Sequence, residues 1–409
     1  MNGSVTMDPS DSRLTAKRLR AHGIILALCL WSVYVWNISA PGLKDRGGVI
    51  KGADFIHLYT LGSVALEHKA ADLYEAEAQA QLTARRVPAA SGVRYIPLYP
   101  PQVSIFFAPL AHLPYVTALI LWLTLSSLVY GFCCYALWRA CPNLRDQGGT
   151  VLLLALAFPG FFHLIVWGQT SAIALACFTV AFFFLRDEQP FVAGLALGCL
   201  IFKPQLGIAA AFVFVSMRAW RVIGGAILSA AVQLAIPILY YGVESLRLWI
   251  RVMWNVAYSI PALEPRPYQT HSLRTFWTML IPGAAVPFAL YALSGILILG
   301  LTIGVWSRRP TTPLGLRYSS LLLASVLLAP HLIVYDLAIL APAFLFLADC
   351  VLSHRPSAAP GLKIVLYLAY LSPLVGPLTR WTHVQISVVL MCVLLYMIWR
   401  AGRAPVAAD

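Results

Sequence analysis

Runs of apolar residues long enough to cross a bilayer recur along the chain, and this feature restricts its fold more than any other. The hydrocarbon core is about 30 Å thick, so about twenty helical residues are needed to cross it. Lipid offers no partners to backbone N–H and C=O groups, so each run is expected to be helical. Only 11% of the 409 residues are charged, against about 25% in soluble domains. The sequence therefore predicts an all-α, polytopic integral membrane protein.

The hydropathy pattern predicts about twelve spanning helices, several of them short. The segment 101–114 is apolar but bounded by prolines, and we expect it to be re-entrant or interfacial. The first run follows three basic residues and resembles a secretory signal, but its length of about eighteen residues favours an uncleaved span. The expected spans are 23–40, 116–138, 150–166, 169–185, 190–203, 206–217, 221–242, 286–306, 318–332, 335–352, 362–378 and 384–399.

Basic residues gather in the tails and short loops on one side of these spans. Such residues mark the cytoplasmic side, so both termini are expected there. We predict a basic cytoplasmic tail over 1–22, a transmembrane domain over 23–400 with extracytoplasmic loops 41–100 and 243–285, and a cytoplasmic tail over 401–409. The residues concerned are 16 of the 29 Lys and Arg: Arg13, Lys17, Arg18, Arg20, Arg139, Arg145, Arg186, Arg218, Arg221, Arg308, Arg309, Arg317, Arg355, Lys363, Arg400 and Arg403.

The formal net charge of +13 does not indicate a nucleic-acid partner, because the basic residues border apolar spans and meet anionic lipid headgroups there. The eight cysteines lie within or beside apolar runs, which indicates neither a disulfide framework nor a cysteine metal site. We expect no cofactor and no metal, since Asp54 has no neighbouring carboxylate to complete a hard-cation site. Membrane lipids are the expected surroundings, and the oligomeric state stays open.

Asp54 is the most informative polar residue, because it begins a polar stretch shortly after the first span. A carboxylate held near the outer membrane surface can deprotonate a substrate that arrives through the bilayer. Ionisable residues at membrane depth are costly and indicate function, so we expect the polar residues of the outer turns to share one outer-facing cavity. They are Asp54, Gln169, Lys203, Gln205, Arg266, His271, Arg274, His331 and Asp336.

Each candidate also has a structural explanation. Asp54 suits a helix N-cap, Lys203 can extend to the headgroups, and His331 can be a hydrogen-bonded core histidine. The remaining candidates suit helix starts (Gln169, Asp336) or solvated loop positions (His271, Arg274).

The first outer loop shows internal order. The spacing of apolar residues over 54–82 predicts short amphipathic helices lying in the membrane interface, where Tyr59 suits the aromatic belt. Tyr99-Pro100-Pro101 then breaks the helix and turns the chain inward.

Short motifs follow one another in a set order: Asp54-Phe55 with Tyr59, Leu73-Tyr74, Tyr99-Pro100-Pro101, Ala108-Pro109-Leu110, Leu113-Pro114, Gly168-Gln169, Lys203-Pro204-Gln205 and Tyr335-Asp336. Taken together they resemble glycosyltransferase family 87, over roughly 45–350 and most specifically in the N-terminal third. The chain departs from the family at Gln269-Thr270-His271-Ser272, where members often carry Asn-Gln-Ser. This departure leaves the sugar and the acceptor open.

The resemblance implies a GT-C-like helical fold in the bacterial inner membrane, similar to polyprenyl-phosphate-mannose-dependent mannosyltransferases that act on phosphatidylinositol mannosides. The donor would be a polyprenyl-phosphate-linked sugar, by default mannose, and the acceptor a glycolipid or glycan outside the cytoplasm. No Gly-rich phosphate loop or Asp-x-Asp pair is present, which argues against a nucleotide-sugar donor.

The resemblance also implies residue roles. Asp54 would be the general base of an inverting transfer. Cationic groups would stabilise the phosphate leaving group: Lys203, His331, His271 and Arg274. The implied substrate contacts are Tyr59, Tyr99, Gln169, Gln205 and Asp336.

Two other classes of protein fit the composition. A polytopic transporter or flippase can carry an acid–base cluster as a proton relay, but the halves of this chain show no evident repeat and its polar residues fall at one face. A receptor-like or scaffold protein leaves the polar cluster without a purpose. Release of polyprenyl phosphate from a donor distinguishes the glycosyltransferase from both.

Overall fold

The computed structural model describes residues 14–256, 263–308, 311–353 and 361–402. Within them the chain is all-α as predicted, with no strand and with two isolated bridges, Lys44 to Ile50 and Thr270 to Ile333. Parts of both predicted tails lie outside the described residues, as do Arg13, Arg309, Arg355 and Arg403.

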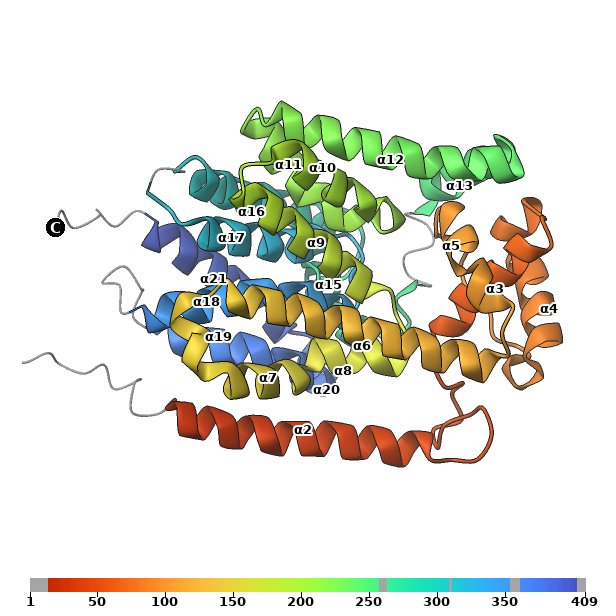
Figure 1. Ribbon diagram of the computed structural model, residues 1–409, viewed down its shortest axis with the longest axis horizontal. Helices are drawn as coiled ribbons and strands as arrows, with labels where there is room; N and C mark the ends of the chain where they lie inside the picture. The colour runs from red at the N-terminus through yellow and green to blue at the C-terminus, as the bar shows by residue number, and fades with distance from the viewer. Residues whose placement is uncertain (1–13, 257–262, 309–310, 354–360, 403–409) are drawn as a thin grey trace, which may run out of the picture. The chain divides into compact units, whose positions relative to one another are not determined.

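The helices follow one another along the chain, mostly through short connections, and longer connections at 39–54 and 87–101 join α2 to α3 and α4 to α5 (Figure 1). The α-helices are α2 (Ala16–Ile38), α3 (Phe55–Leu66), α4 (Ala76–Arg86), α5 (Gln102–Ala111), α6 (Tyr115–Arg139), α7 (Gly148–Leu156), α8 (Pro159–Trp167), α9 (Ser171–Arg186), α10 (Pro190–Gly198), α11 (Ile208–Ser216), α12 (Trp220–Tyr241), α13 (Glu244–Trp254), α15 (Leu273–Leu280), α16 (Ala285–Trp306), α17 (Leu314–Leu328), α18 (Ala341–Leu352), α19 (Leu362–Leu371), α20 (Gly376–Thr382) and α21 (Ile386–Ala401). The 3-10 helices are η1 (Ala71–Tyr74), η2 (Pro88–Ala90), η3 (Pro142–Gln147), η4 (Cys199–Phe202), η5 (Pro204–Gly207), η6 (Pro267–Gln269), η7 (Val334–Leu340) and η8 (Ser372–Val375).

The chain forms two compact units. Unit 1 comprises residues 1–31, 131–162 and 268–409, and unit 2 comprises 32–130 and 163–267. In unit 1, α17 packs against α16, α18 and α21, and every residue from Tyr318 to Leu328 is buried. This central apolar helix forms the core of unit 1.

Unit 2 contains helices that pack at very short range. A Cβ at Gly194 of α10 would lie 2.1 Å from the Val222 carbonyl oxygen of α12, and one at Gly225 would lie 2.1 Å from the Phe191 carbonyl oxygen. Gly62 of α3 meets the Phe107 carbonyl of α5 in the same way, at 2.4 Å. Small residues allow helix backbones to approach this closely, which is how helices associate in lipid.

Among the described residues, six helices are long and apolar enough to cross a membrane, or seven segments if the bent pair α7–α8 counts as one span. The predicted number of about twelve spans is therefore not confirmed. The predicted spans at 169–185, 190–203, 206–217, 318–332 and 384–399 correspond to apolar helices of 10–17 residues, which are shorter than the roughly twenty required. The six long segments are Ala16–Ile38, Tyr115–Arg139, Trp220–Tyr241, Ala285–Trp306, Val334–Leu352 and Leu362–Thr382.

Prolines account for two of the differences. The predicted span 150–166 is broken by 44° between α7 and α8, where α8 begins at Pro159. The predicted span 318–332 ends as a helix at Leu328, since Pro330 follows and Ala329 has the extended ψ of 124°. Proline has no N–H and disfavours helical geometry in the residue before it.

The first loop differs from an array of interfacial helices. Residues Phe55 to Ala65 of α3 are all buried, so α3 is a core helix of unit 2 and not an amphipathic one. α4 buries Gln79, Leu82 and Thr83 and exposes most of its other residues, as an amphipathic helix does. Close packing against α5 through Gly62 removes the free face that α3 was expected to have.

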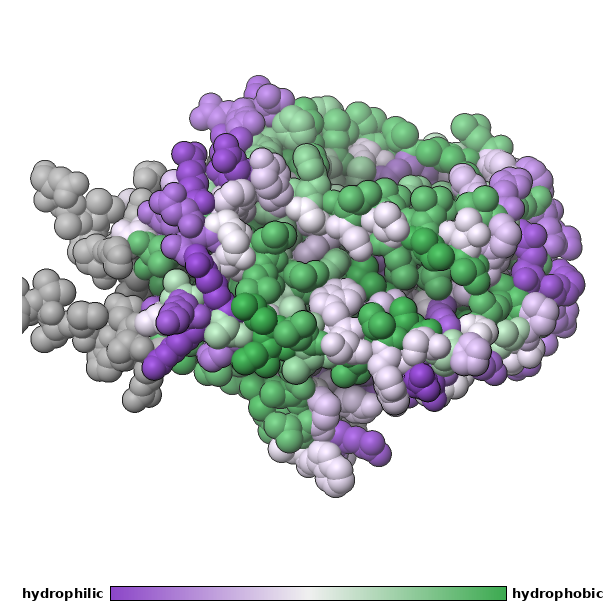
Figure 2. All heavy atoms as spheres, turned by 60° about the horizontal axis from the view of Figure 1, so that its bottom comes forward, coloured by the Kyte–Doolittle hydropathy of each residue, from purple (hydrophilic) through white to green (hydrophobic). Residues whose placement is uncertain are grey.

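Several long helices direct apolar side chains outward. On α12, Ile227, Val232 and Leu239 are 64%, 54% and 87% exposed. Much of the molecular face in Figure 2 is hydrophobic. Apolar side chains exposed along a long apolar helix suit a lipid environment, so the chain is a multi-pass membrane protein.

Candidate functional site

Asp54 occupies the N-cap position of α3, but its side chain makes no capping hydrogen bond. Its backbone N–H donates to the Trp167 carbonyl oxygen at 2.9 Å, which ties the start of α3 to the turn after α8. The carboxylate is half-buried. The position is thus that of a cap, while the carboxylate is directed to another partner.

The turn at Trp167-Gly168-Gln169 is built to approach α3. Gly168 has a φ of +69°, and a Cβ there would lie 2.8 Å from the Phe55 Cβ, so any other residue would be strained and crowded. The Trp122 indole N–H donates to the Gly168 carbonyl oxygen at 2.8 Å. These contacts fix Gln169 beside Asp54.

The Gln169 side chain lies between Asp54 and Lys203. Its Nε2 donates to Asp54 Oδ2 at 2.7 Å, and its Oε1 accepts from Lys203 Nζ at 3.3 Å and from the Tyr99 hydroxyl at 3.2 Å. The Thr170 backbone N–H donates to the same Oε1 at 3.1 Å. An amide with its oxygen toward the donors and its NH₂ toward the carboxylate has one consistent orientation. We call Asp54, Gln169, Lys203 and Tyr99 the polar network.

Lys203 lies at the break between η4 and η5, with a non-helical φ of −136° and ψ of 69°. Pro204 begins the next helical turn, which forces this break. The residue is only 5% exposed, and its amine bonds to Gln169. A snorkelling lysine ends in water or headgroups, so the geometry does not support that alternative.

Among the described residues, the other predicted substrate contacts of unit 2, Tyr59 and Gln205, make no hydrogen bond to the polar network. The Tyr59 hydroxyl donates to the Leu113 carbonyl oxygen at 2.8 Å, which fixes it at the turn between α5 and α6. Gln205 lies in η5, two residues after Lys203, and is half-buried. The structure therefore joins Tyr99 to the polar network by a hydrogen bond and places Gln205 in the adjoining turn.

Tyr95 and His57 were not predicted as site residues. The Tyr95 hydroxyl donates to the Ala53 carbonyl oxygen, and its ring stacks on the His57 ring at 4.6 Å. Burial, and then the Asp54 carboxylate, raise the pKa of Tyr95 above its usual range, whereas burial lowers the pKa of His57 to about 4. Tyr95 lies four residues before Tyr99 in a tyrosine- and proline-rich stretch, which is the only signal the sequence offered.

Gln102 is another buried polar residue that the sequence did not single out. It is 9% exposed at the first position of α5, and neither its Nε2 nor its Oε1 has a hydrogen-bond partner among the described residues. Unpartnered buried amides are uncommon and need an explanation. Gln102 follows Tyr99 by three residues, so it is a further candidate for substrate contact.

Arg266 is an exposed residue of unit 2, and the other four candidates belong to unit 1. His271 is fully buried and bonds through Nδ1 to the Ser387 hydroxyl at 2.6 Å, while the Arg274 Nε donates to the Pro330 carbonyl oxygen at 2.5 Å. His331 lies in the segment paired with residues 270–271 and is half-buried. Neither His271 nor Arg274 is a solvated loop residue, so that alternative is wrong for both.

Asp336 is 3% exposed and occupies the third position of η7, whose N-cap is Ile333. It therefore does not cap this helix. Its backbone N–H donates to the Ile333 carbonyl oxygen at 2.8 Å.

The polar network contains one carboxylate and one amine joined by an amide. Such a set can take a proton and stabilise a negative charge, which are the two needs of a group transfer from a phosphate. Among the described residues, no group of three or more His, Cys, Asp or Glu side chains is placed to hold a metal ion.

A comparison with known protein families matches the region that contains most of the polar network. The family model for glycosyltransferase family 87 matches residues 98–330, which is 233 of the 409 residues. The match includes Tyr99, Gln169 and Lys203, and it leaves out Asp54, although the N-terminal third was expected to resemble the family most. Searches of curated proteins and of solved structures found no match. The matched region covers more than half of the chain, so the chain belongs to glycosyltransferase family 87.

Proposed function

We propose that this protein transfers a sugar from a polyprenyl-phosphate donor to a hydroxyl of a lipid or glycan acceptor. Membership of family 87 and the long apolar helices identify a membrane glycosyltransferase. Mannose is the proposed sugar, the bacterial inner membrane the proposed location, and the extracytoplasmic side the proposed side of reaction, with both termini in the cytoplasm. The positive-inside distribution of Lys and Arg supports this orientation.

The observation that carries the proposal is the bridging amide of Gln169. It holds the Asp54 carboxylate at 2.7 Å on one side and the Lys203 amine at 3.3 Å on the other. A base and a cation separated by one amide group suit a reaction in which a proton leaves one oxygen while charge develops on another.

In the proposed reaction Asp54 accepts the proton of the acceptor hydroxyl as that oxygen bonds to the anomeric carbon. The bond between this carbon and the donor phosphate oxygen breaks, and its electron pair leaves with polyprenyl phosphate. Lys203 stabilises the charge that develops on the phosphate. The network contains a single carboxylate, and retention by double displacement needs a second, nucleophilic one, so we propose inversion.

Further contacts complete the proposal. Tyr99, Gln169, Gln205 and Tyr59 of unit 2 are proposed substrate contacts. For unit 1, the donor-phosphate roles of His331, His271 and Arg274 and the substrate contact of Asp336 stay predictions from the sequence. Loss of any donor-phosphate group should raise the KM for the polyprenyl-phosphate sugar, which alanine variants would measure one at a time.

The decisive test is Asp54→Asn. The amide retains the size of the carboxylate and can still accept from Gln169, but it no longer takes a proton at neutral pH. Purified enzyme, reconstituted with polyprenyl-phosphate mannose and a membrane lipid extract, should release polyprenyl phosphate about 10²–10⁴-fold more slowly. Donor binding, measured separately, should be unchanged.

The matched control is Glu75→Gln, which neutralises an exposed acid of the same loop. It should retain full turnover. Near-normal turnover by Asp54→Asn would remove Asp54 from the mechanism. If the wild-type protein moves lipid across vesicles without releasing polyprenyl phosphate, the transporter alternative replaces the glycosyltransferase.

A further inference from the structure

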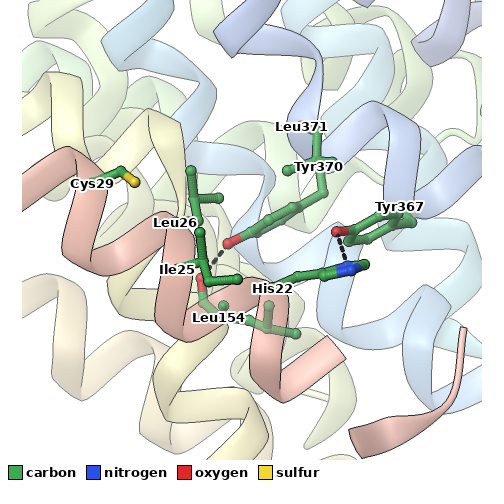
Figure 3. A pocket seen from close by; sticks show the side chains of 9 residues that line it. His22, Ile25, Leu26, Cys29, Leu154, Tyr367, Tyr370 and Leu371 are labelled. Atoms are coloured by element: carbon green, nitrogen blue, oxygen red, sulfur yellow. Dashed lines mark hydrogen bonds between the residues drawn. The ribbon is translucent and has the colours of Figure 1, made fainter. Parts of the chain in front are cut away.

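A mainly apolar groove of about 300 Å³ lies between α2, α7 and α19 in unit 1 (Figure 3). Leu26, Leu154 and Leu371 are among its lining residues. Both tyrosine hydroxyls in it are hydrogen-bonded, one to a side chain and one to the backbone. His22 Nδ1 and the Tyr367 hydroxyl hydrogen-bond at 2.7 Å, and the Tyr370 hydroxyl donates to the Leu154 carbonyl oxygen at 2.7 Å.

The helices around the groove run in the same direction. Along α2, Arg20 bonds to Thr150 of α7 at 2.6 Å, and Trp31 bonds to the Leu156 carbonyl oxygen at 3.1 Å. Helices α2 and α7 are therefore parallel. The α2 residue His22 is paired with Tyr367, and the later residue Cys29 lines the groove with Leu371, so α19 runs the same way.

Two of the three helices, α2 and α19, carry cations about one turn before the groove. Arg18 precedes His22 by four residues and Lys363 precedes Tyr367 by four, so each shares a helix face with a lining residue. Arg20 is held at Thr150, four residues before Leu154. The N-terminal ends of the helices also favour negative charge. An apolar groove thus has a cationic end.

Little of α2 is covered by protein. Its apolar window is 11% buried, against 17–67% for the other five long segments. Ile25 in the groove is 60% exposed. In a bilayer such a space is filled by lipid, because an empty gap loses the dispersion contacts of its walls.

We propose that this groove binds one anionic glycerophospholipid. Its acyl chain lies along Leu26, Cys29 and Leu371, and its phosphate is held by Arg18, Arg20 and Lys363. A volume of about 300 Å³ is at the lower limit of ligand pockets and suits part of a single acyl chain better than a long polyprenyl chain. The groove shares no residue with the polar network.

The charge requirement is tested with the delipidated full chain in neutral detergent by native mass spectrometry, using phosphatidylglycerol and phosphatidylcholine with the same acyl chains. We expect one tightly held phosphatidylglycerol and no equivalent phosphatidylcholine. Each cation near a phosphate contributes about fivefold in affinity, so Arg18→Gln with Lys363→Gln should weaken binding about 25-fold. Lys17→Gln removes a neighbouring charge that lies off this face and should have little effect.

The acyl-chain requirement is tested by filling the groove. Cys29→Trp should abolish the tightly held lipid, whereas Leu28→Trp, at an exposed residue outside the groove lining, should not. Equal retention of both phospholipids, equal binding by both tryptophan variants, or displacement of phosphatidylglycerol by equimolar polyprenyl phosphate would each overturn the proposal. None of these measurements depends on glycosyl transfer.

Discussion

Gly168 packs directly on Phe55: a Cβ at Gly168 would lie 2.8 Å from the Phe55 Cβ, and the φ of Gly168 is +69°. This contact brings the turn after α8 to the first residue of α3, next to Asp54. Space and backbone geometry together exclude a side chain at this position.

Gly168→Ala should therefore destabilise unit 2 and lower turnover. A strained left-handed backbone alone costs about 1–3 kcal/mol, and the Cβ would push the turn away from α3. We expect a lower Tm and a loss of kcat, since a displaced base is a poorer one. Gly131→Ala is the control, because a Cβ there meets no atom within 4 Å. An unchanged Tm for Gly168→Ala would contradict the packing described.

Gln169→Leu tests whether the amide positions Asp54. Leucine has about the same size as glutamine. It has neither the N–H group that donates to Asp54 Oδ2 nor the oxygen that accepts from Lys203 Nζ. Misplacement of a catalytic group by about 1 Å can cost about 10²-fold, so kcat should fall by that order. A shift in the pH profile of kcat should accompany the fall, which a purely structural role would not produce. Gln81→Leu, at an exposed position of α4, should leave both unchanged.

Lys203→Gln should weaken capture of the donor. Removing the ammonium leaves the leaving-group phosphate without this cation, so we expect a raised KM for the polyprenyl-phosphate sugar and partial rescue by Lys203→Arg. Lys69→Gln removes an exposed lysine that pairs with Glu67 and serves as the control. If Lys203→Gln has wild-type KM and kcat, the buried amine has a structural role alone.

Gln102→Leu separates stability from activity. A buried amide without a partner costs about 1–3 kcal/mol, so replacing it with an apolar side chain of similar size should maintain or raise the Tm. We expect kcat/KM to fall nevertheless, because the amide would bond to substrate hydroxyls. A variant with a higher Tm and full kcat/KM would assign Gln102 no role in the reaction.

The buried His57 should make the free energy of unfolding smaller in mild acid than at neutral pH. Burial lowers its pKa from 6.5 to about 4, so the unfolded chain binds more protons than the folded one between these values. The free energy of unfolding should be fully present above about pH 6.5 and should fall, by at most about 1.4 kcal/mol per pH unit, as the pH drops toward 4.

Thermal unfolding in a neutral detergent would measure this pH dependence. His57→Phe can still stack on Tyr95 and should flatten the dependence between pH 6.5 and 4. His112→Phe, at an exposed histidine, should leave it unchanged. An equal slope in wild type and His57→Phe would place the acid sensitivity elsewhere.

Hydropathy and single polar residues were sufficient to recognise an all-α membrane protein and to select Asp54, Gln169 and Lys203. Both inferences rest on local properties: the length of an apolar run decides whether it can cross a bilayer, and a polar residue beside such a run is conspicuous wherever it packs. The number of spans could not be obtained in this way. Pro159 and Pro330 end or bend helices within apolar runs that hydropathy reads as continuous.

The side-chain partners of the candidate residues are set by contacts between distant parts of the chain. Gln169 meets Asp54 across 115 residues, and His271 meets Ser387 across 116. The burial of α3 follows from the approach of α5 at Gly62, and neither segment shows this by itself. Helix packing and hydrogen-bond geometry are set by the folded arrangement as a whole, so tertiary structure alone made Gln169 a bridge and Tyr59 a tie to the Leu113 backbone.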